Sequence, residues 1–249
     1  MGDLIIVQKL ESIAFIKLNR PEKCNALNIP LLKELISALT KLNEDLSIRC
    51  LIIYGAGNYF CAGLDLEEAA DIKNSKLSGE LLAETFSLIN KCPHITIAAV
   101  HGTVLAGGVG IISACDFTVA TDNSRIGLPE VHKGLVPALV MTLLLRKLKP
   151  SDAREFILLG ETISAQKALS IGLITEINSI DKNLDNAISL AKRVLQGKPQ
   201  AIKKAKNLLE KLQPIPLEKA MKIALQEHES IRNSKEAQEE ISAWINRPK

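Results

Sequence analysis

The chain has 249 residues, of which 47% are hydrophobic but only 3% aromatic, so it can build a sizeable core that is mainly aliphatic. Its 31 basic and 28 acidic residues leave a net charge of +3, and this near balance argues against a nucleic-acid-binding protein. The sequence has neither a signal-like N-terminus nor an apolar run long enough for a membrane span, so we expect a cytoplasmic protein without a membrane partner.

The N-terminal part of the chain predicts strands and helices in alternation. Two apolar runs on either side of a turn at 11–12 predict a hairpin, and short connections between the later elements predict parallel crossovers. The expected strands are 4–9, 12–18, 50–54, 95–100 and 116–120. The expected helices are 30–43 and 109–114, with a helix-rich polar stretch over 66–91.

From about residue 137 onward, helix follows helix. Only one short strand, at 173–177, interrupts the helical pattern. We therefore divide the chain into an α/β core, residues 1–185, and a C-terminal helical region, residues 186–249. This helical region is too thin to enclose a rich core alone, so we expect it to pack on the core or on another subunit.

Two glycine-punctuated turns carry the strongest chemical signal. The first is Ala-Gly-Leu-Asp at 62–65, and the second is Leu-Ala-Gly-Gly-Val-Gly at 105–110, which opens an apolar helix. Glycine permits positive φ and close approach to a ligand, and N–H groups at helix starts lack acceptors. The turns therefore predict an oxyanion hole. The carboxylate of Glu130 follows the second turn and predicts a proton carrier for chemistry beside a carbonyl.

The cysteines and histidines show no spacing typical of a metal site or a disulfide framework. The five cysteines are an odd number, are widely spaced and form no Cys-x-x-Cys pair, and the four histidines form no cluster. We therefore expect reduced thiols and no bound metal.

Four segments resemble, in order and at family spacing, the signatures of the crotonase family, also called the enoyl-CoA hydratase/isomerase family. They are 18–28 (LNRPEKCNALN), 59–66 (YFCAGLDL), 107–117 (GGVGIISACDF) and 127–137 with its Gly-Leu-Pro-Glu and Gly-Leu-Val-Pro ends. The resemblance runs nearly end to end. It implies a core of spiralling ββα turns, an acyl-CoA thioester as ligand with no further cofactor, and a homotrimer or hexamer. It also implies a closing helix, around 244–248, that covers the acyl pocket.

The resemblance assigns site residues by position. The backbone N–H groups of Leu64 and Gly107 would hold the thioester oxygen, and Glu130 would carry the proton. The positive end of the helix dipole at Gly107 would favour the same oxygen. Substrate or CoA contacts are implied for Lys23, Ala26, Ala62, Asp65, Leu66, Gly108 and Pro129. Lys23 could equally be solvated, and Asp65 could instead fix its turn. The remaining lining of the pocket is expected from residues 66–90.

The chain departs from the family pattern at Gly110. Many hydratases of the family carry a second glutamate there, and hydration often uses two carboxylates to hold one water, whereas moving a double bond needs one base. This departure favours a 3-enoyl to 2-enoyl-CoA isomerase. A finer resemblance, over 107–111 and 130–138, to the branch that contains 3-methylglutaconyl-CoA hydratases favours a hydratase, in which a carboxylate of the substrate could help to place the water. We expect an enoyl-CoA hydratase. The alternatives are the isomerase, a decarboxylase or thioester hydrolase of the same family, and a non-catalytic acyl-CoA-binding protein.

Overall fold

The computed structural model describes residues 3–179, 182–213 and 215–245. The chain divides into two compact units, Met1–Lys192 and Arg193–Lys249. This division falls inside helix α8 (Asn183–Leu195), whereas the sequence analysis placed it after residue 185. Residues 246–248 of the predicted closing helix lie outside the described part of the chain.

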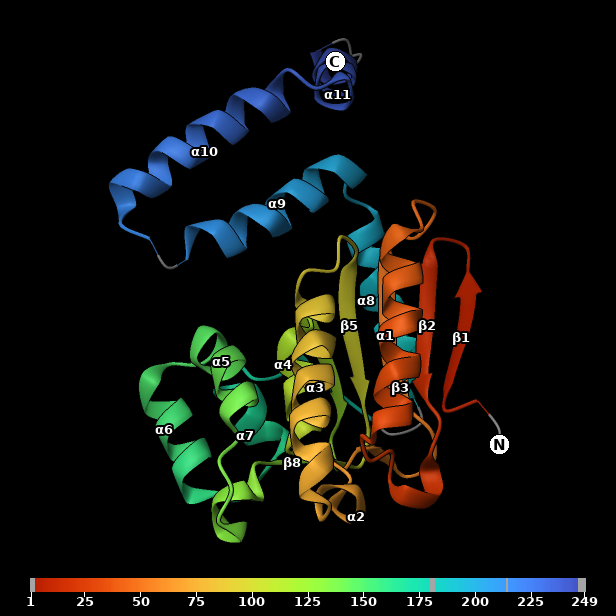
Figure 1. The fold of residues 1–249 in the computed structure, drawn as a ribbon. Coiled ribbons are helices and arrows are strands. Elements are labelled where there is room, and N and C mark those ends of the chain that lie inside the picture. Colours follow the sequence, from red (N-terminus) through yellow and green to blue (C-terminus); the bar gives the residue numbers. More distant parts are fainter. Residues whose placement is uncertain (1–2, 180–181, 214, 246–249) are drawn as a thin grey trace. The chain divides into compact units, whose positions relative to one another are not determined.

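Six strands form the main sheet of the first unit (Figure 1). In spatial order they are β1 (Ile5–Leu10), β2 (Ile13–Leu18), β3 (Cys50–Gly55), β5 (Ile95–Val100), β7 (Phe117–Thr121) and β10 (Glu176–Asn178). β1 and β2 form the predicted antiparallel hairpin, and every later pair in this sheet is parallel. β5 is buried at all its positions, which is typical of a parallel strand that is covered on both faces.

A second sheet, which the sequence analysis did not predict, contains four short strands. Its order is β4 (Tyr59–Cys61), β6 (Thr103–Leu105), β8 (Arg125–Gly127) and β9 (Thr162–Ser164). Each turn of the chain gives one strand to each sheet: β3 then β4, β5 then β6, β7 then β8. The core is therefore the predicted α/β spiral of ββα turns.

Two long helices lie side by side along the main sheet, α1 (Ile29–Glu44) and α3 (Ser75–Asn90) (Figure 1). The side chain of Asn28 caps α1 by accepting a hydrogen bond from the N–H of Leu31, at 3.0 Å. The buried face of α1 contains Leu31, Leu32, Leu35, Leu39 and Leu42. The short helix α2 (Leu66–Ala69) and the 3₁₀ turn η2 (Ile72–Asn74) lead into α3.

Helix α4 (Gly107–Ala114) is buried at every position, and a lysine fixes its C-terminal end. Lys147 Nζ lies 3.0 Å from the carbonyl oxygen of Cys115 and 3.4 Å from that of Ile112. A cation beside these carbonyls complements the helix dipole. Burial nevertheless lowers the pKa of Lys147. Lys147 belongs to α5 (Ala138–Lys147), which is followed by α6 (Pro150–Leu159) and α7 (Ala165–Ser170).

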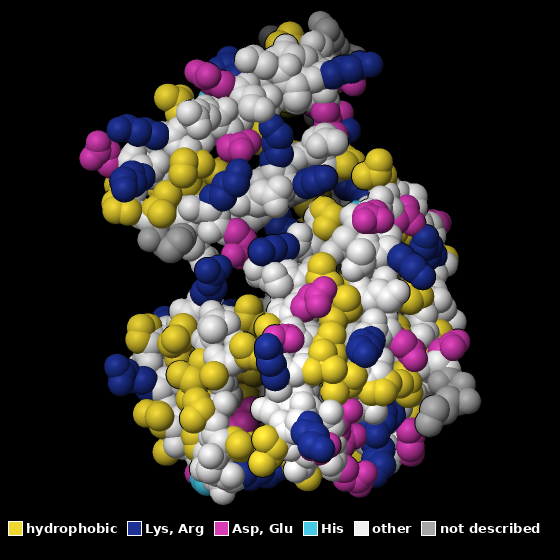
Figure 2. All heavy atoms as spheres, in the orientation of Figure 1, with side chains coloured by type: hydrophobic (Ala, Val, Ile, Leu, Met, Phe, Trp, Pro, Cys, Tyr) yellow, Lys and Arg dark blue, Asp and Glu magenta, His cyan; other side chains and the backbone are white. Residues whose placement is uncertain are grey.

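The second unit contains α9 (Pro199–Leu212), α10 (Leu217–Arg232) and α11 (Lys235–Ile245). Lys204 and Lys211 of α9 lie 3.6 and 3.5 Å from the carboxylate of Glu227 in α10. No described residue of α10 or α11 is buried. Large apolar side chains are exposed on the three helices of this unit (Figure 2): Leu209 of α9, and Leu217, Met221, Leu225, Ile241, Trp244 and Ile245 of α10 and α11. Among the described residues, no helix combines the length and the apolar character that crossing a bilayer requires.

A buried ion pair joins the opening segment to the first glycine turn. Arg20 Nη1 lies 2.5 Å from Asp65 Oδ2, and the two side chains are 12% and 8% exposed. Arg20 also donates to the carbonyl of Ala26, while Asp65 Oδ1 accepts from the N–H groups of Glu67 and Glu68 and caps α2. Burial acts to raise the pKa of Asp65, but the hydrogen bonds from Arg20, Glu68 and Glu67 outweigh it and hold that pKa below its usual value.

We expect Asp65→Asn to lower the free energy of unfolding by about 3 kcal/mol, because it leaves the buried Arg20 guanidinium without a counter-charge. Urea unfolding at pH 7 measures this loss. Since the pKa of Asp65 is lowered on folding, the ion pair stabilises the protein above the unfolded pKa of about 3.9, and its contribution is lost as the pH falls through the folded pKa. The difference between wild type and Asp65→Asn should therefore shrink in acid.

The matched control is Glu67→Gln. It breaks the ion pair between Lys23 and Glu67, which joins the same two segments but is exposed. We expect this change to cost less than about 1 kcal/mol. Equal losses from the two variants would show that burial of the Arg20–Asp65 pair has no special effect.

Candidate functional site

A cavity of about 940 Å³ opens in the first unit, and both glycine turns line it. Its walls come from residues 22–26, the two turns, α2, the start of α3, the 3₁₀ helix η3 (Pro129–Lys133) and α5. Leu64, Gly107 and Glu130 all line this one cavity. The structure therefore brings together the three groups for which the sequence analysis predicted catalytic roles.

The first turn is held against the opening segment by backbone hydrogen bonds. The N–H of Leu27 donates to the carbonyl of Gly63 at 2.7 Å, and the N–H of Asp65 donates to the carbonyl of Leu27 at 3.2 Å. In such a parallel bridge, the intervening residue points its own N–H away from the partner. The N–H of Leu64 is thus turned away from Leu27 and donates to no acceptor in the described part of the chain.

The second turn packs directly on the first. Gly63 has φ +87°, and a Cβ placed on it would lie 2.6 Å from the Cβ of Ala106 and 3.0 Å from the nitrogen of Gly107. Only glycine fits there. Gly107 is the first residue of α4, so its N–H has no acceptor within the helix, and no described residue accepts from it. Two unpaired N–H donors therefore belong to turns in close contact and line the same cavity.

Ala106 holds the second turn in a strained conformation. Its φ of 49° and ψ of −116° lie in a region that residues with a Cβ rarely adopt. Such a conformation costs about 1–3 kcal/mol and persists only where the surroundings impose it. The sequence analysis noted the glycines of this turn, but the strained residue is the alanine before them.

Glu130 presents an unpartnered carboxylate oxygen. Oε2 is fully buried and has no hydrogen-bond partner among the described residues. Burial raises the pKa of Glu130, and the opposing effects of its own backbone N–H and of the Lys133 charge are smaller. A half-buried acid with one buried, unpartnered oxygen and a raised pKa, in a largely apolar cavity, is suited to exchange a proton with a bound molecule.

A phenylalanine ring fills the space beside Gly110. A Cβ placed on Gly110 would lie 2.0 Å from Cζ of Phe86, which belongs to α3 and is only 4% exposed. A longer side chain at 110, including a glutamate, has no room unless this ring moves. The structure thus gives a physical reason for the glycine, which the sequence analysis recorded only as a missing carboxylate.

The other predicted contact residues fall into two groups. Those that line the cavity are Lys23, Ala26, Ala62, Asp65, Leu66 and Pro129. Asp65 does so with a carboxylate already engaged by Arg20 and α2. Gly108 does not line the cavity. A Cβ on Gly108 would lie 2.7 Å from the carbonyl oxygen of Cys61, so this glycine instead lets α4 pack closely on β4.

One wall of the cavity was missed. The sequence analysis expected the lining from 66–90, and residues between Leu66 and Leu82 do contribute. Lys133 and residues 135–140, where the chain leaves η3 and enters α5, also line the cavity. The sequence does contain a signal for these residues, the apolar run at 135–136 within a loop. In the structure the side chains of Leu135 and Val136 are 50% and 70% exposed.

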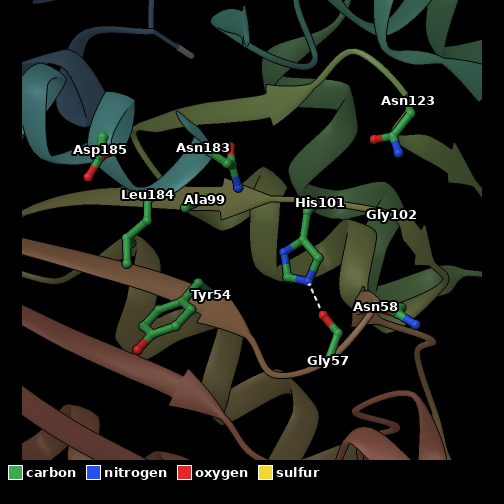
Figure 3. A pocket seen from close by; sticks show the side chains of 10 residues that line it. All are labelled: Tyr54, Gly57, Asn58, Ala99, His101, Gly102, Asn123, Asn183, Leu184 and Asp185. Carbon is green, nitrogen blue, oxygen red and sulfur yellow. Dashed lines mark hydrogen bonds between the residues drawn. The ribbon is translucent and has the colours of Figure 1, made fainter. Parts of the chain in front are cut away.

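A second cavity, of about 470 Å³, lies just beyond the ends of β3 and β5 (Figure 3). Several polar side chains line it, among them Asn58, Asn123 and Asp185, and His101 Nε2 lies 2.8 Å from the carbonyl oxygen of Gly57. None of the predicted site residues lines it. Within the described residues, no group of three or more His, Cys, Asp or Glu side chains could hold a metal ion.

The sequence matches the family model described as "Enoyl-CoA hydratase/isomerase" over residues 8–249. It is 31% identical to a 2,3-dehydroadipyl-CoA hydratase of Escherichia coli (strain K12), over 97% of this chain and 95% of the relative. It is 32% identical to a crotonyl-CoA hydratase of Syntrophomonas wolfei, over 88% and 86% of the two chains. A crystal structure of an enoyl-CoA hydratase from Bacillus anthracis superposes with a TM-score of 0.93 at 30% identity, covering 98% of this chain and 96% of the other.

We expect Gly110→Ala to lower the free energy of unfolding by about 1–3 kcal/mol, because the new methyl group overlaps the buried Phe86 ring. The matched control is Gly79→Ala in α3, where an added Cβ has no neighbour within 4 Å. That change should raise the free energy of unfolding by about 0.5–1 kcal/mol, as alanine does in a helix. Urea unfolding compares the two, and stabilisation by both would contradict the tight contact at 110.

Proposed function

The chain belongs to the enoyl-CoA hydratase/isomerase family, and we propose that it adds water across the double bond of a 2-enoyl-CoA thioester with two backbone N–H groups and one carboxylate. The observation that carries this proposal is that Leu64, Gly107 and Glu130 line one largely apolar cavity. The relatives named as hydratases favour hydration over isomerisation. The resemblance to the 3-methylglutaconyl-CoA hydratase branch stays a prediction about the acyl group.

The thioester oxygen accepts hydrogen bonds from the N–H groups of Leu64 and Gly107. Glu130 holds a water molecule and takes one of its protons as the water oxygen bonds to the β carbon. The electron pair of the double bond moves to the thioester oxygen, where the two N–H groups stabilise the enolate. Each such donor typically contributes about 2.7–4 kcal/mol to transition-state stabilisation.

Glu130 then returns its proton to the α carbon, so a single carboxylate serves first as base and then as acid. Water has been added and the carboxylate regenerated. Burial raises the pKa of Glu130 toward the working pH. This suits both steps, because a group that first accepts and then donates a proton works best when its pKa is near that pH. The Phe86 ring beside Gly110 supports a one-carboxylate mechanism, since it occupies the space that a second acid at 110 would need.

The substrate contacts follow from the walls of the cavity. We assign the CoA part to the wall that contains Lys23, Ala26 and Ala62, and the acyl part to the apolar walls. The reaction uses water, the thioester and groups of this chain, and no separate cofactor. We also propose a cytoplasmic location, supported by the five cysteines, all in the described part of the chain, none of which forms a disulfide.

We expect Glu130→Gln to lower kcat for hydration of crotonyl-CoA by about 10²–10⁴-fold, because the amide cannot exchange the proton. The matched control is Glu22→Gln, which removes another carboxylate that lines the cavity but is exposed, and which should stay within about threefold of wild type. Loss of the ultraviolet absorbance of the conjugated thioester measures the rate.

Because burial raises the pKa of Glu130, kcat/KM of the wild type should fall in acid with a midpoint pH above the ordinary glutamate pKa of about 4.3. Activity of Glu130→Gln within threefold of wild type would remove Glu130 from the mechanism.

We further propose that the chain forms a homotrimer or a hexamer through its C-terminal helices. The support is the exposed apolar side chains of α9, α10 and α11, since an amphipathic helix normally buries its apolar face. Closed symmetric assemblies are the usual way in which identical chains cover such faces.

Sedimentation velocity at micromolar concentration should give three or six times the chain mass of 27.1 kDa. Leu225→Lys, which places a charge on the apolar side of α10, should shift the protein toward smaller species. The polar change Lys219→Gln in the same helix should not. A monomeric wild-type protein would contradict the proposal.

A further inference from the structure

One lysine that lines the cavity, Lys133, is exposed and forms no ion pair with a carboxylate in the described part of the chain. The described residues that line the cavity include two lysines, Lys23 and Lys133. Lys23 Nζ lies 2.7 Å from Glu67 Oε1 and is therefore paired. The Lys133 side chain forms no hydrogen bond or ion pair with any described residue. A cation beside a mostly apolar wall, with no hydrogen-bond or ion-pair partner among the residues that the structure describes, is available to an anionic group of the bound molecule.

The 3₁₀ geometry of η3 places this lysine in line with the proposed proton carrier. Side chains three residues apart eclipse one another in a 3₁₀ helix, and each residue rises by about 2.0 Å. Glu130 and Lys133 are three residues apart in η3, and both line the cavity. Their backbone positions are therefore separated by about 6 Å along one face.

This spacing indicates which anionic group of the substrate meets Lys133. In the proposed function, Glu130 acts at the double bond, next to the thioester. The phosphates of CoA lie at the far end of the pantetheine arm, whereas a short acyl chain ends only a few bonds beyond the double bond. If the acyl chain itself ends in a carboxylate, that carboxylate can reach the ammonium group of Lys133, which lies one helical turn from Glu130.

We propose that Lys133 selects 2-enoyl-CoA thioesters whose acyl chain ends in a carboxylate. The inference rests on the proposed function and deepens it, because it assigns a class of acyl group to the same cavity. The ammonium group of Lys133 donates to the terminal carboxylate and draws the acyl chain along the wall formed by η3 and residues 135–140. The thioester end stays at Leu64 and Gly107. Lys133 thus acts as a specificity residue and takes no part in proton transfer.

The test compares three thioesters that share a six-carbon chain: 2-hexenedioyl-CoA, its ω-methyl ester and 2-hexenoyl-CoA. We expect wild type to favour the free diacid over the methyl ester by about tenfold or more in kcat/KM, as a charge-assisted hydrogen bond in a cavity allows. Lys133→Gln should remove this preference mainly by raising KM for the diacid, and Lys133→Arg should retain it. Lys149→Gln, at an exposed lysine that does not line the cavity, should leave all three substrates unchanged.

A second arm separates the acyl carboxylate from the CoA phosphates. If Lys133 bound a phosphate instead, Lys133→Gln would raise KM for crotonyl-CoA but not for crotonyl-pantetheine, and that result would overturn the inference. Hydration of 2-hexenoyl-CoA by wild type without a preference for the diacid would also overturn it, while leaving the proposed function intact. Hydration of none of the esters would overturn both.

Discussion

The site depends on the close contact between two turns that are far apart in the sequence. The Cα of Gly63 lies so near the second turn that a single added carbon would overlap Ala106 and crowd the nitrogen of Gly107. In the proposed function, the N–H groups of Leu64 and Gly107 face the same oxygen of the bound thioester. Backbone donors of this kind are fixed before the substrate arrives, which is the condition under which they stabilise developing charge most strongly.

The rest of the first unit holds these turns in place. The Arg20–Asp65 pair and the backbone bridge at Leu27 anchor the first turn to the opening segment. The second turn is continuous with α4, which is buried throughout and whose last carbonyls are held by Lys147. These contacts offset the strain at Ala106, since a residue at positive φ keeps that conformation only when its surroundings impose it.

Most strands of the main sheet and both glycine turns could be predicted from the sequence, because each depends on the pattern of residues within a short segment. Aliphatic runs predicted the strands of the main sheet, and glycines at two loop-to-helix junctions predicted the turns that line the cavity. The second sheet was missed because strands of three residues, such as β4, are too short to show alternation. Contacts between distant side chains were missed for another reason. The contact of Phe86 with Gly110 and the ion pair of Arg20 with Asp65 could not be predicted, because the two residues of each pair are far apart in the sequence and come together only in the folded chain.

The packing of Phe86 on Gly110 also limits how the proposed active site can change over evolution. A glutamate or aspartate introduced at 110 while Phe86 is still present would overlap the phenylalanine ring and destabilise the fold. A smaller residue arriving first at 86 would leave a void, which is itself destabilising. The two positions are therefore epistatic. A lineage can pass between one-acid and two-acid chemistry only through a less stable ancestor or through two nearly simultaneous substitutions.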